Sequence, residues 1–150
     1  MKYVHNVRIT VFIKQEEDYQ KNKAAFLSLV PFSLEDEKIS LNERNVVGFH
    51  EVPIKILEVV LEKERHVKSF LDQFLSKLSS EQKEMLLRQK ESRLDDENFF
   101  FIRLDKDHLM DHKEYFVIDG GNCFHIKMHI AAFPASRENA LKVVDTLLKS

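Results

Sequence analysis

The histidines and the single cysteine of this chain are the residues best suited to hold a metal ion or to take part in nucleophilic catalysis. His108 and His112 are four residues apart, a spacing that places two imidazoles on one face of a helix. No glutamate stands between them in the zinc-protease position, and the paired cysteines of a structural zinc site are absent. Cys123 lies two residues before His125, but no helix start beside it would activate its thiolate. We therefore predict no metal, no cofactor and no enzymatic activity.

The remaining candidates for catalytic chemistry are weaker. His125 and His129 fall on the same face of a predicted strand, where they are about 13 Å apart and cannot share a metal ion directly. Asp95 and Asp96 would suit acid–base work, but adjacent aspartates at a turn usually bond their own backbone. Gly120 and Gly121 lack the further glycines, the lysine and the following helix of a phosphate-binding loop.

Binding chemistry is more evident, because alternation in three predicted strands separates an apolar face from an aromatic and basic one. The apolar positions, which we expect in the core, are Val7, Ile9, Val11, Phe100, Ile102, Leu104, Phe124, Ile126, Met128 and Ile130. The opposite face then carries Arg8, Phe12, Phe99, Phe101, Arg103, His125, Lys127 and His129. Bases stack on aromatic rings and phosphates pair with cations, so this face suits nucleic acid. The alternative is that a helix covers the face and its rings are ordinary core residues.

The elements that must position these residues follow from the hydrophobic periodicity. Strands are predicted at 3–14, 37–46, 54–60, 99–104 and 124–130, and helices at 18–29, 67–78, 80–92 and 136–149. A turn is predicted at 48–53, a second turn at 95–98, an irregular or helical piece at 106–114, and a hairpin loop at 119–122. Strands grouped in pairs predict an α+β fold with a mostly antiparallel sheet and helices packed on it.

Composition sets limits on the class of protein. The chain of 150 residues is expected to form a single domain, residues 1–150, and its one cysteine suits a reducing compartment. No signal peptide or apolar run of membrane-spanning length is visible, so we expect a cytoplasmic protein without membrane contact. The formal net charge of −2 is unusual for a nucleic-acid binder, but a basic face can coexist with acidic helices.

Two segments resemble an archaeal RNA-binding family that is also described as predicted exosome subunits. The first is Gly48–Ile54, with its Pro-Ile turn, and the second is Arg93–Lys106, with an acidic turn, an aromatic strand and an Arg-Leu-Asp-Lys end. The chain departs from the family pattern at Glu51 and Val52, where a Gly-Asn pair is expected. The resemblance implies a layered α/β fold, with three layers, similar to that of the ribosomal protein that holds the 5S RNA.

The resemblance also implies RNA contacts at Arg93, Arg103 and Lys106, whereas His125, Lys127 and His129 follow from the alternation. For Arg93 and Arg103 the competing interpretation is a structural ion pair with Asp95 or Asp105. These features together predict a non-catalytic RNA-binding protein, accessory to RNA processing or the exosome, with RNA and RNA-processing proteins as partners. One alternative is a protein-interaction or dimerisation module, which would form a homodimer. Another is a metal-dependent enzyme built around His108, His112 and Cys123.

Overall fold

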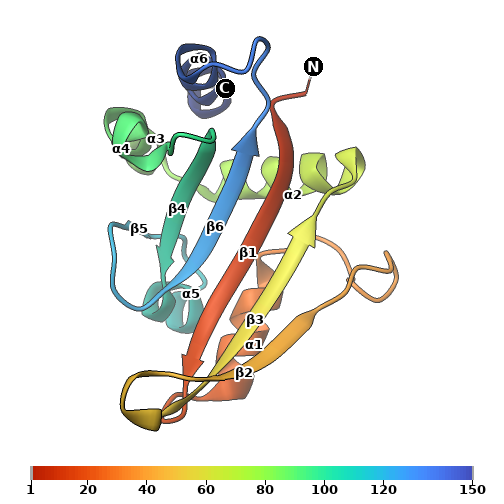
Figure 1. The fold of residues 1–150 in the computed structure, drawn as a ribbon, viewed down its shortest axis with the longest axis vertical. Helices are drawn as coiled ribbons and strands as arrows, with labels where there is room; N and C mark the ends of the chain where they lie inside the picture. The colour runs from red at the N-terminus through yellow and green to blue at the C-terminus, as the bar shows by residue number, and fades with distance from the viewer. Residues whose placement is uncertain (1, 150) are drawn as a thin grey trace.

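The computed structural model describes residues 2–149, with the backbone alone at Phe49. Within that range six strands form one sheet in the order β2-β3-β1-β6-β4-β5, and every pair of neighbours is antiparallel (Figure 1). The strands are β1 (Val4–Lys14), β2 (Asn42–Val47), β3 (Pro53–Leu61), β4 (Phe99–Asp105), β5 (Val117–Ile118) and β6 (Cys123–Ile130). The helices are α1 (Tyr19–Ser28), the 3-10 turn η1 (Phe49–Glu51), α2 (Glu64–Lys77), α3 (Ser80–Arg88), α4 (Lys90–Arg93), α5 (Lys106–His112) and α6 (Arg137–Lys149).

One side of the sheet forms the hydrophobic core. The ten apolar positions predicted to face it on β1, β4 and β6 are each at most 3% exposed. The helices add rings and branched side chains to the same core, among them Phe26, Phe70, Phe74, Leu86 and Val144. Each such side chain stabilises the fold by roughly 1.5–3 kcal/mol through burial. The predicted α+β class and the predicted core face are therefore confirmed.

The other side of the sheet has no helix over it among the described residues. Figure 1 shows the helices behind the strands or beside their upper ends, and none in front of them. Phe12, on this side, is 44% exposed. The alternative of a helix covering this face is thus wrong, and the fold has two layers where the resemblance implies three.

Most of the predicted elements are confirmed. Strands at 3–14, 54–60, 99–104 and 124–130 correspond to β1, β3, β4 and β6, and all four predicted helices are present. The Ser79 hydroxyl accepts a hydrogen bond from the backbone N–H of Gln82 and so caps α3, while Ser136 does the same for Asn139 at the start of α6. Helix 80–92 is interrupted at Gln89, where α3 ends and the short α4 begins.

The strand predicted at 37–46 is wrong in its first half. Residues 34–38 form a turn that is closed by backbone hydrogen bonds from Glu37 to Ser33 and from Ile39 to Leu34. Lys38 has a φ of 57°, which an extended strand does not tolerate. The strand β2 therefore begins only at Asn42, although Ile39 still packs against the core.

The hairpin predicted around 119–122 is also wrong, although the loop itself is present. Ile118 of β5 pairs with Arg103 of β4, and β6 pairs with β4 on its other side. The loop therefore carries the chain past β4 instead of joining two paired strands. Its glycines serve the turn, and Gly121 has a φ of 89°, a conformation that favours glycine.

Candidate nucleic-acid interface

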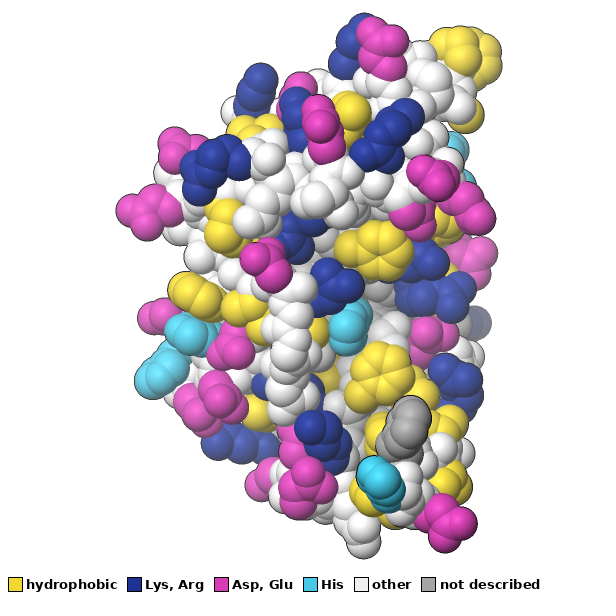
Figure 2. Space-filling view, turned by 60° about the vertical axis from the view of Figure 1, so that its left-hand side comes forward, with side chains coloured by type: hydrophobic (Ala, Val, Ile, Leu, Met, Phe, Trp, Pro, Cys, Tyr) yellow, Lys and Arg dark blue, Asp and Glu magenta, His cyan; other side chains and the backbone are white. Residues whose placement is uncertain are grey.

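The uncovered side of the sheet brings together seven of the nine predicted site residues, six of them on the neighbouring strands β4 and β6. We call the following eight side chains the open face: Arg8, Phe12, Phe99, Phe101, Arg103, His125, Lys127 and His129. Arg8 and Phe12 are exposed, and the other six are half-buried. This face lies in the right half of Figure 2, where hydrophobic, histidine and basic side chains are intermixed.

The register of the strands makes neighbours of residues that are far apart in the sequence. Phe101 lies opposite Lys127, and Lys127 lies opposite Arg8, so a ring and two cations form one row across β4, β6 and β1. In the next row Arg103 lies opposite His125. Directly opposed side chains in antiparallel strands are about 5 Å apart at their Cβ atoms, so each row is a continuous surface.

The rings at one end of the open face stack on one another. The Phe99 and His129 rings are nearly parallel, with centroids 4.3 Å apart and planes at 18°. His5 adds a third ring, 5.1 Å from His129. The Lys127 ammonium lies 4.3 Å from the centroid of Phe99 and 5.5 Å from that of Phe101. This cation–π contact holds a positive charge directly beside an aromatic platform.

His5 is a member of this cluster that the alternation misses. Strict alternation from Val7 would place His5 on the core side. The pairing of β1 with β6 shifts between Val4 and Asn6, and this irregularity turns Val4 into the core and His5 outward. A β-bulge leaves little trace in the hydrophobic pattern, so the sequence gives no warning of it.

Two cations of the open face have no anionic partner. Within the described residues, no carboxylate lies within ion-pair distance of Arg103 or Lys127. Arg8 pairs with Glu58 at 3.4 Å, a contact that is half-exposed and weak. The open face therefore has positive charge that is available to an external anion.

His125 takes part in this face as a ring more than as a charge. Burial lowers the pKa of its imidazole, and the charges of Arg103 and Lys106 lower it further. The ring meets Phe12 edge-on, with centroids 5.6 Å apart. Near neutral pH His125 is thus a neutral aromatic surface.

This effect on His125 can be measured by following its imidazole resonances in an NMR titration. We expect the Arg103→Gln variant to raise the titration midpoint of His125, because a nearby positive charge that opposes protonation is removed. The matched control is Arg8→Gln, since Arg8 is not among the charges that act on His125. Equal midpoints in wild type and Arg103→Gln would show that Arg103 does not set the electrostatics of this row.

Arg93 is placed differently from the expectation that it contacts RNA directly. Its side chain is 5% exposed, and its guanidinium donates to Gln89, to the carbonyls of Phe101 and Ile118, and to Asp119 at 2.8 Å. The competing interpretation of a structural pair fits this geometry, with Asp119 as the partner instead of Asp95 or Asp105. Arg93 fastens α4 to the edge of the sheet.

Lys106 is also absent from the open face. Its side chain is 1% exposed, and its ammonium donates to the Phe12 carbonyl at 2.7 Å and to both carboxylate oxygens of Glu17, at 3.2 and 3.0 Å. Burial lowers the pKa of this ammonium, and the Glu17 carboxylate opposes that shift. The prediction that Lys106 contacts RNA does not fit this placement, because no surface is left for a ligand.

The histidine and cysteine positions do not assemble into a metal centre in the part of the chain that the structure describes, where no three potential ligands come together. The rings of His108 and His112 are 6.3 Å apart between centroids. His108 instead bonds Asp105 at 2.6 Å, and Cys123 is buried. None of the described helices combines the length and the apolar character needed to cross a bilayer.

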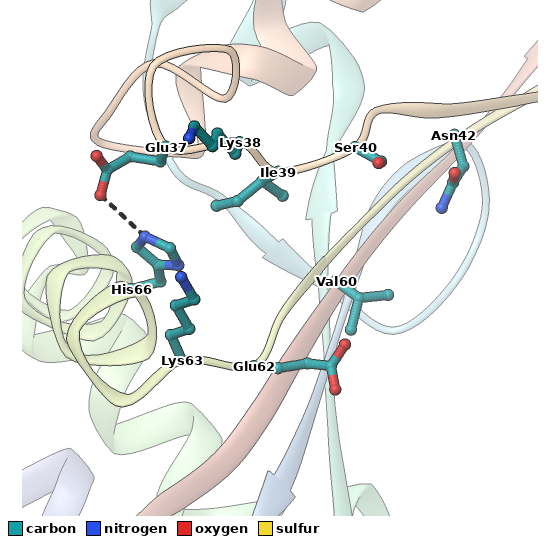
Figure 3. Close-up of a pocket in the computed structure, with 9 residues that line it drawn as sticks. All are labelled: Glu37, Lys38, Ile39, Ser40, Asn42, Val60, Glu62, Lys63 and His66. Atoms are coloured by element: carbon teal, nitrogen blue, oxygen red, sulfur yellow. Dashed lines mark hydrogen bonds and ion pairs between the residues drawn. The ribbon is translucent and has the colours of Figure 1, made fainter.

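A separate hollow of about 350 Å³ lies where α2 begins (Figure 3). Figure 3 shows His66 reaching Glu37, to which its Nε2 atom is 2.9 Å distant. The ionic side chains around it are two acids and two bases, which are Glu37, Glu62, Lys38 and Lys63. Because these charges balance, the hollow has no net charge with which to select an ionic ligand.

Geometry thus defines the class of this protein: a two-layer α+β domain whose sheet presents an uncovered aromatic and basic face. Residues 6–131 match the family model described as RNA binding, and the chain belongs to this family. An RNA-binding protein of Pyrococcus abyssi is 28% identical over 144 residues, which cover 93% of this chain and 90% of that protein.

Solved structures agree with the fold. A protein from Archaeoglobus fulgidus superposes with a TM-score of 0.84 and 28% identity, over 96% of this chain and 99% of the other. A protein from Methanothermobacter thermautotrophicus gives a TM-score of 0.78 at 23% identity, over 98% of this chain and 99% of the other. The second likeness shows the fold alone.

Proposed function

We propose that this protein binds RNA through the open face of its sheet and does not catalyse a reaction on it. The observation that carries the proposal is the pair of cations without anionic partners, Arg103 and Lys127, beside the stacked rings of Phe99 and His129. Membership of a family described as RNA binding supports it, as does the name of the Pyrococcus abyssi relative.

The open face offers the two interactions that an RNA strand needs. Arginine can grip a phosphate with two parallel hydrogen bonds, and lysine supplies a point charge. Aromatic rings accept unpaired bases, and each stacked base contributes about 1–3 kcal/mol. Because bases inside a duplex cannot reach such rings, the face favours single-stranded segments, loops or ends. The net charge of −2 is compatible with this, since a basic face can coexist with acidic side chains elsewhere on the same protein.

The resemblance to predicted exosome subunits and to the ribosomal protein that holds the 5S RNA supports a finer proposal. We infer that the protein is an accessory of RNA processing, with proteins of that machinery as its partners. The site residues proposed for RNA are the eight of the open face. Arg93 and Lys106 are left out because their side chains are buried in structural ion pairs.

The test is binding of labelled single-stranded and hairpin RNA across a salt series. Affinity for the single strand is expected to fall as salt rises, with a slope of about −0.7 for each phosphate contact. The Arg103→Ala, Lys127→Ala double variant is expected to bind about tenfold more weakly at low salt and to reduce the slope by about 1.4. The RNA is expected to remain intact during the measurement.

The matched control is the Lys68→Ala, Lys142→Ala double variant, which removes the same charge from exposed positions of α2 and α6. It is expected to bind like the wild type. Absence of binding at low salt would overturn the proposal. If the open face then proved to be buried between two subunits in solution, the dimerisation module would replace it.

A further inference from the structure

A small cleft lies beside the open face at the β4–β5 edge of the sheet, on the side turned forward in Figure 2. Its volume is about 300 Å³. That is the lower end of the range for small-molecule pockets, so the cleft fits one small group. Its walls come from three parts of the chain, and the lining residues are Gln89, Ser92, Arg93, Phe101, Arg103 and Asp119.

The charge of this cleft is positive and partly fixed in place. Two guanidinium groups, of Arg93 and Arg103, face a single carboxylate, that of Asp119. The Asp119 side chain is 81% exposed, so water weakens its contribution inside the cleft. Arg93 is held at the floor by four hydrogen-bond acceptors, and its charge therefore acts on a ligand without a loss of side-chain entropy.

Arg103 supplies the second positive charge of the site. Its side chain is half-buried, and no ion pair or side-chain hydrogen bond engages it among the described residues. A guanidinium in that state has a complete fork of N–H donors to offer to a phosphate. Its position opposite His125 places it between the cleft and the open face.

Phe101 supplies an aromatic wall. Its side chain lines the cleft, and the Lys127 ammonium lies 5.5 Å from the centroid of its ring. The same ammonium also contacts the ring of Phe99. The cleft therefore combines a ring with unpaired positive charge, which are the groups that recognise a base and a phosphate respectively. Phe99, whose ring stacks on that of His129 in the neighbouring β6, lies two residues before Phe101 on the same strand.

We infer that this cleft is a nucleotide subsite, in which the phosphate of one nucleotide pairs with Arg103 above the fixed charge of Arg93 and its base packs against Phe101. The inference rests on the proposed function, because it assigns a fixed point to the RNA path on the open face. A base that enters the cleft has left its stack, so the ligand class is single-stranded RNA.

The experiment is an NMR titration of the full chain with adenosine 5′-monophosphate, followed through the backbone amides of Phe101, Arg103 and Asp119. These amides are expected to shift in a saturable manner. Adenosine and inorganic phosphate, each of which lacks one half of the recognition, are expected to bind at least about tenfold more weakly. The Arg103→Gln variant is expected to lose about tenfold in affinity for the nucleotide. The matched control is Lys142→Gln, at an exposed position of α6 outside the open face, and it should stay within about twofold.

The outcomes separate this inference from the proposed function. If oligonucleotides bind but Arg103→Gln and Lys142→Gln lose the same affinity for the nucleotide, the subsite is overturned and the RNA-binding function stands. Oligonucleotide binding without nucleotide shifts in the cleft would have the same meaning. Nucleotide shifts confined to the cleft, with no affinity for any oligonucleotide, would support the subsite and overturn RNA binding by the open face. Shifts spread evenly over the open face would also overturn the subsite.

Discussion

Replacing Lys106 with methionine is expected to lower the free energy of unfolding by about 3 kcal/mol. The side chain is 1% exposed, and its ammonium donates hydrogen bonds to the Glu17 carboxylate and to the carbonyl of Phe12. Methionine has a similar length but no donor, so the Phe12 carbonyl and a carboxylate that is 15% exposed lose their positive partner. Glu17 keeps bonds from the Lys14 N–H and from Asn122, which holds the cost near the lower end of the usual range.

Urea unfolding of the wild type and the variant gives this difference directly. The matched control is Lys21→Met, which breaks an ion pair of 2.6 Å with Asp111 whose side chains are 51% and 43% exposed. Because water screens that pair, its loss is expected to lower the stability much less than the loss of the buried Lys106–Glu17 pair. Adding Glu17→Gln to Lys106→Met should restore part of the stability, since it removes the uncompensated charge. A cost for Lys106→Met no larger than that for Lys21→Met would show that the buried pair does not hold β1 to α5.

The elements that the sequence predicts well are those whose pattern is local. In β6 the residues from Phe124 to Ile130 alternate without exception, and the buried and half-buried positions of the structure follow that alternation. The same is true of β4, so the composition of the open face could be predicted residue by residue. Side chains alternate between the two sides of a strand. Once the apolar residues of β4 and β6 are assigned to the core, their rings and cations must therefore lie on the opposite side of the sheet.

What could not be predicted depends on partners distant in sequence. Arg93 and Lys106 have the same residue types as true surface cations, and only their contacts with Asp119 and Glu17, 26 and 89 residues away, show them to be structural. The crossing of the 119–122 loop past β4 likewise depends on strand order, which the turn residues do not encode. In these cases residue type indicated the chemistry, and tertiary pairing decided where it was used.

The absence of a covering helix is a further property that the sequence left open. Apolar residues on both sides of a strand fit a buried sheet as well as an exposed aromatic face. The structure decides the matter, because no helix of the described residues lies over the open face, and Phe12 is 44% exposed. The rings of the open face are therefore available to a ligand, and their contribution can be tested apart from that of the charges.

The Phe99→Leu, Phe101→Leu double variant is expected to lose roughly 30- to 1,000-fold in affinity for single-stranded RNA, or about 2–4 kcal/mol. Leucine retains apolar volume in these half-buried positions but offers no π-face for a base. The loss should appear in RNA-binding titrations at every salt concentration. The salt slope should stay unchanged because no phosphate contact is removed.

The matched control for the rings is Phe116→Leu, Phe133→Leu. These two phenylalanines are 41% and 98% exposed and lie outside the open face, so they share the residue type and are more accessible than the half-buried Phe99 and Phe101. The control is expected to bind RNA like the wild type. An equal loss in both double variants would assign the affinity to nonspecific contact with exposed rings. A loss confined to the Phe99→Leu, Phe101→Leu variant, with the salt slope unchanged, would locate the bases on β4. It would also separate the contribution of stacking from that of charge, because the rings and the cations of one surface would then respond to different substitutions.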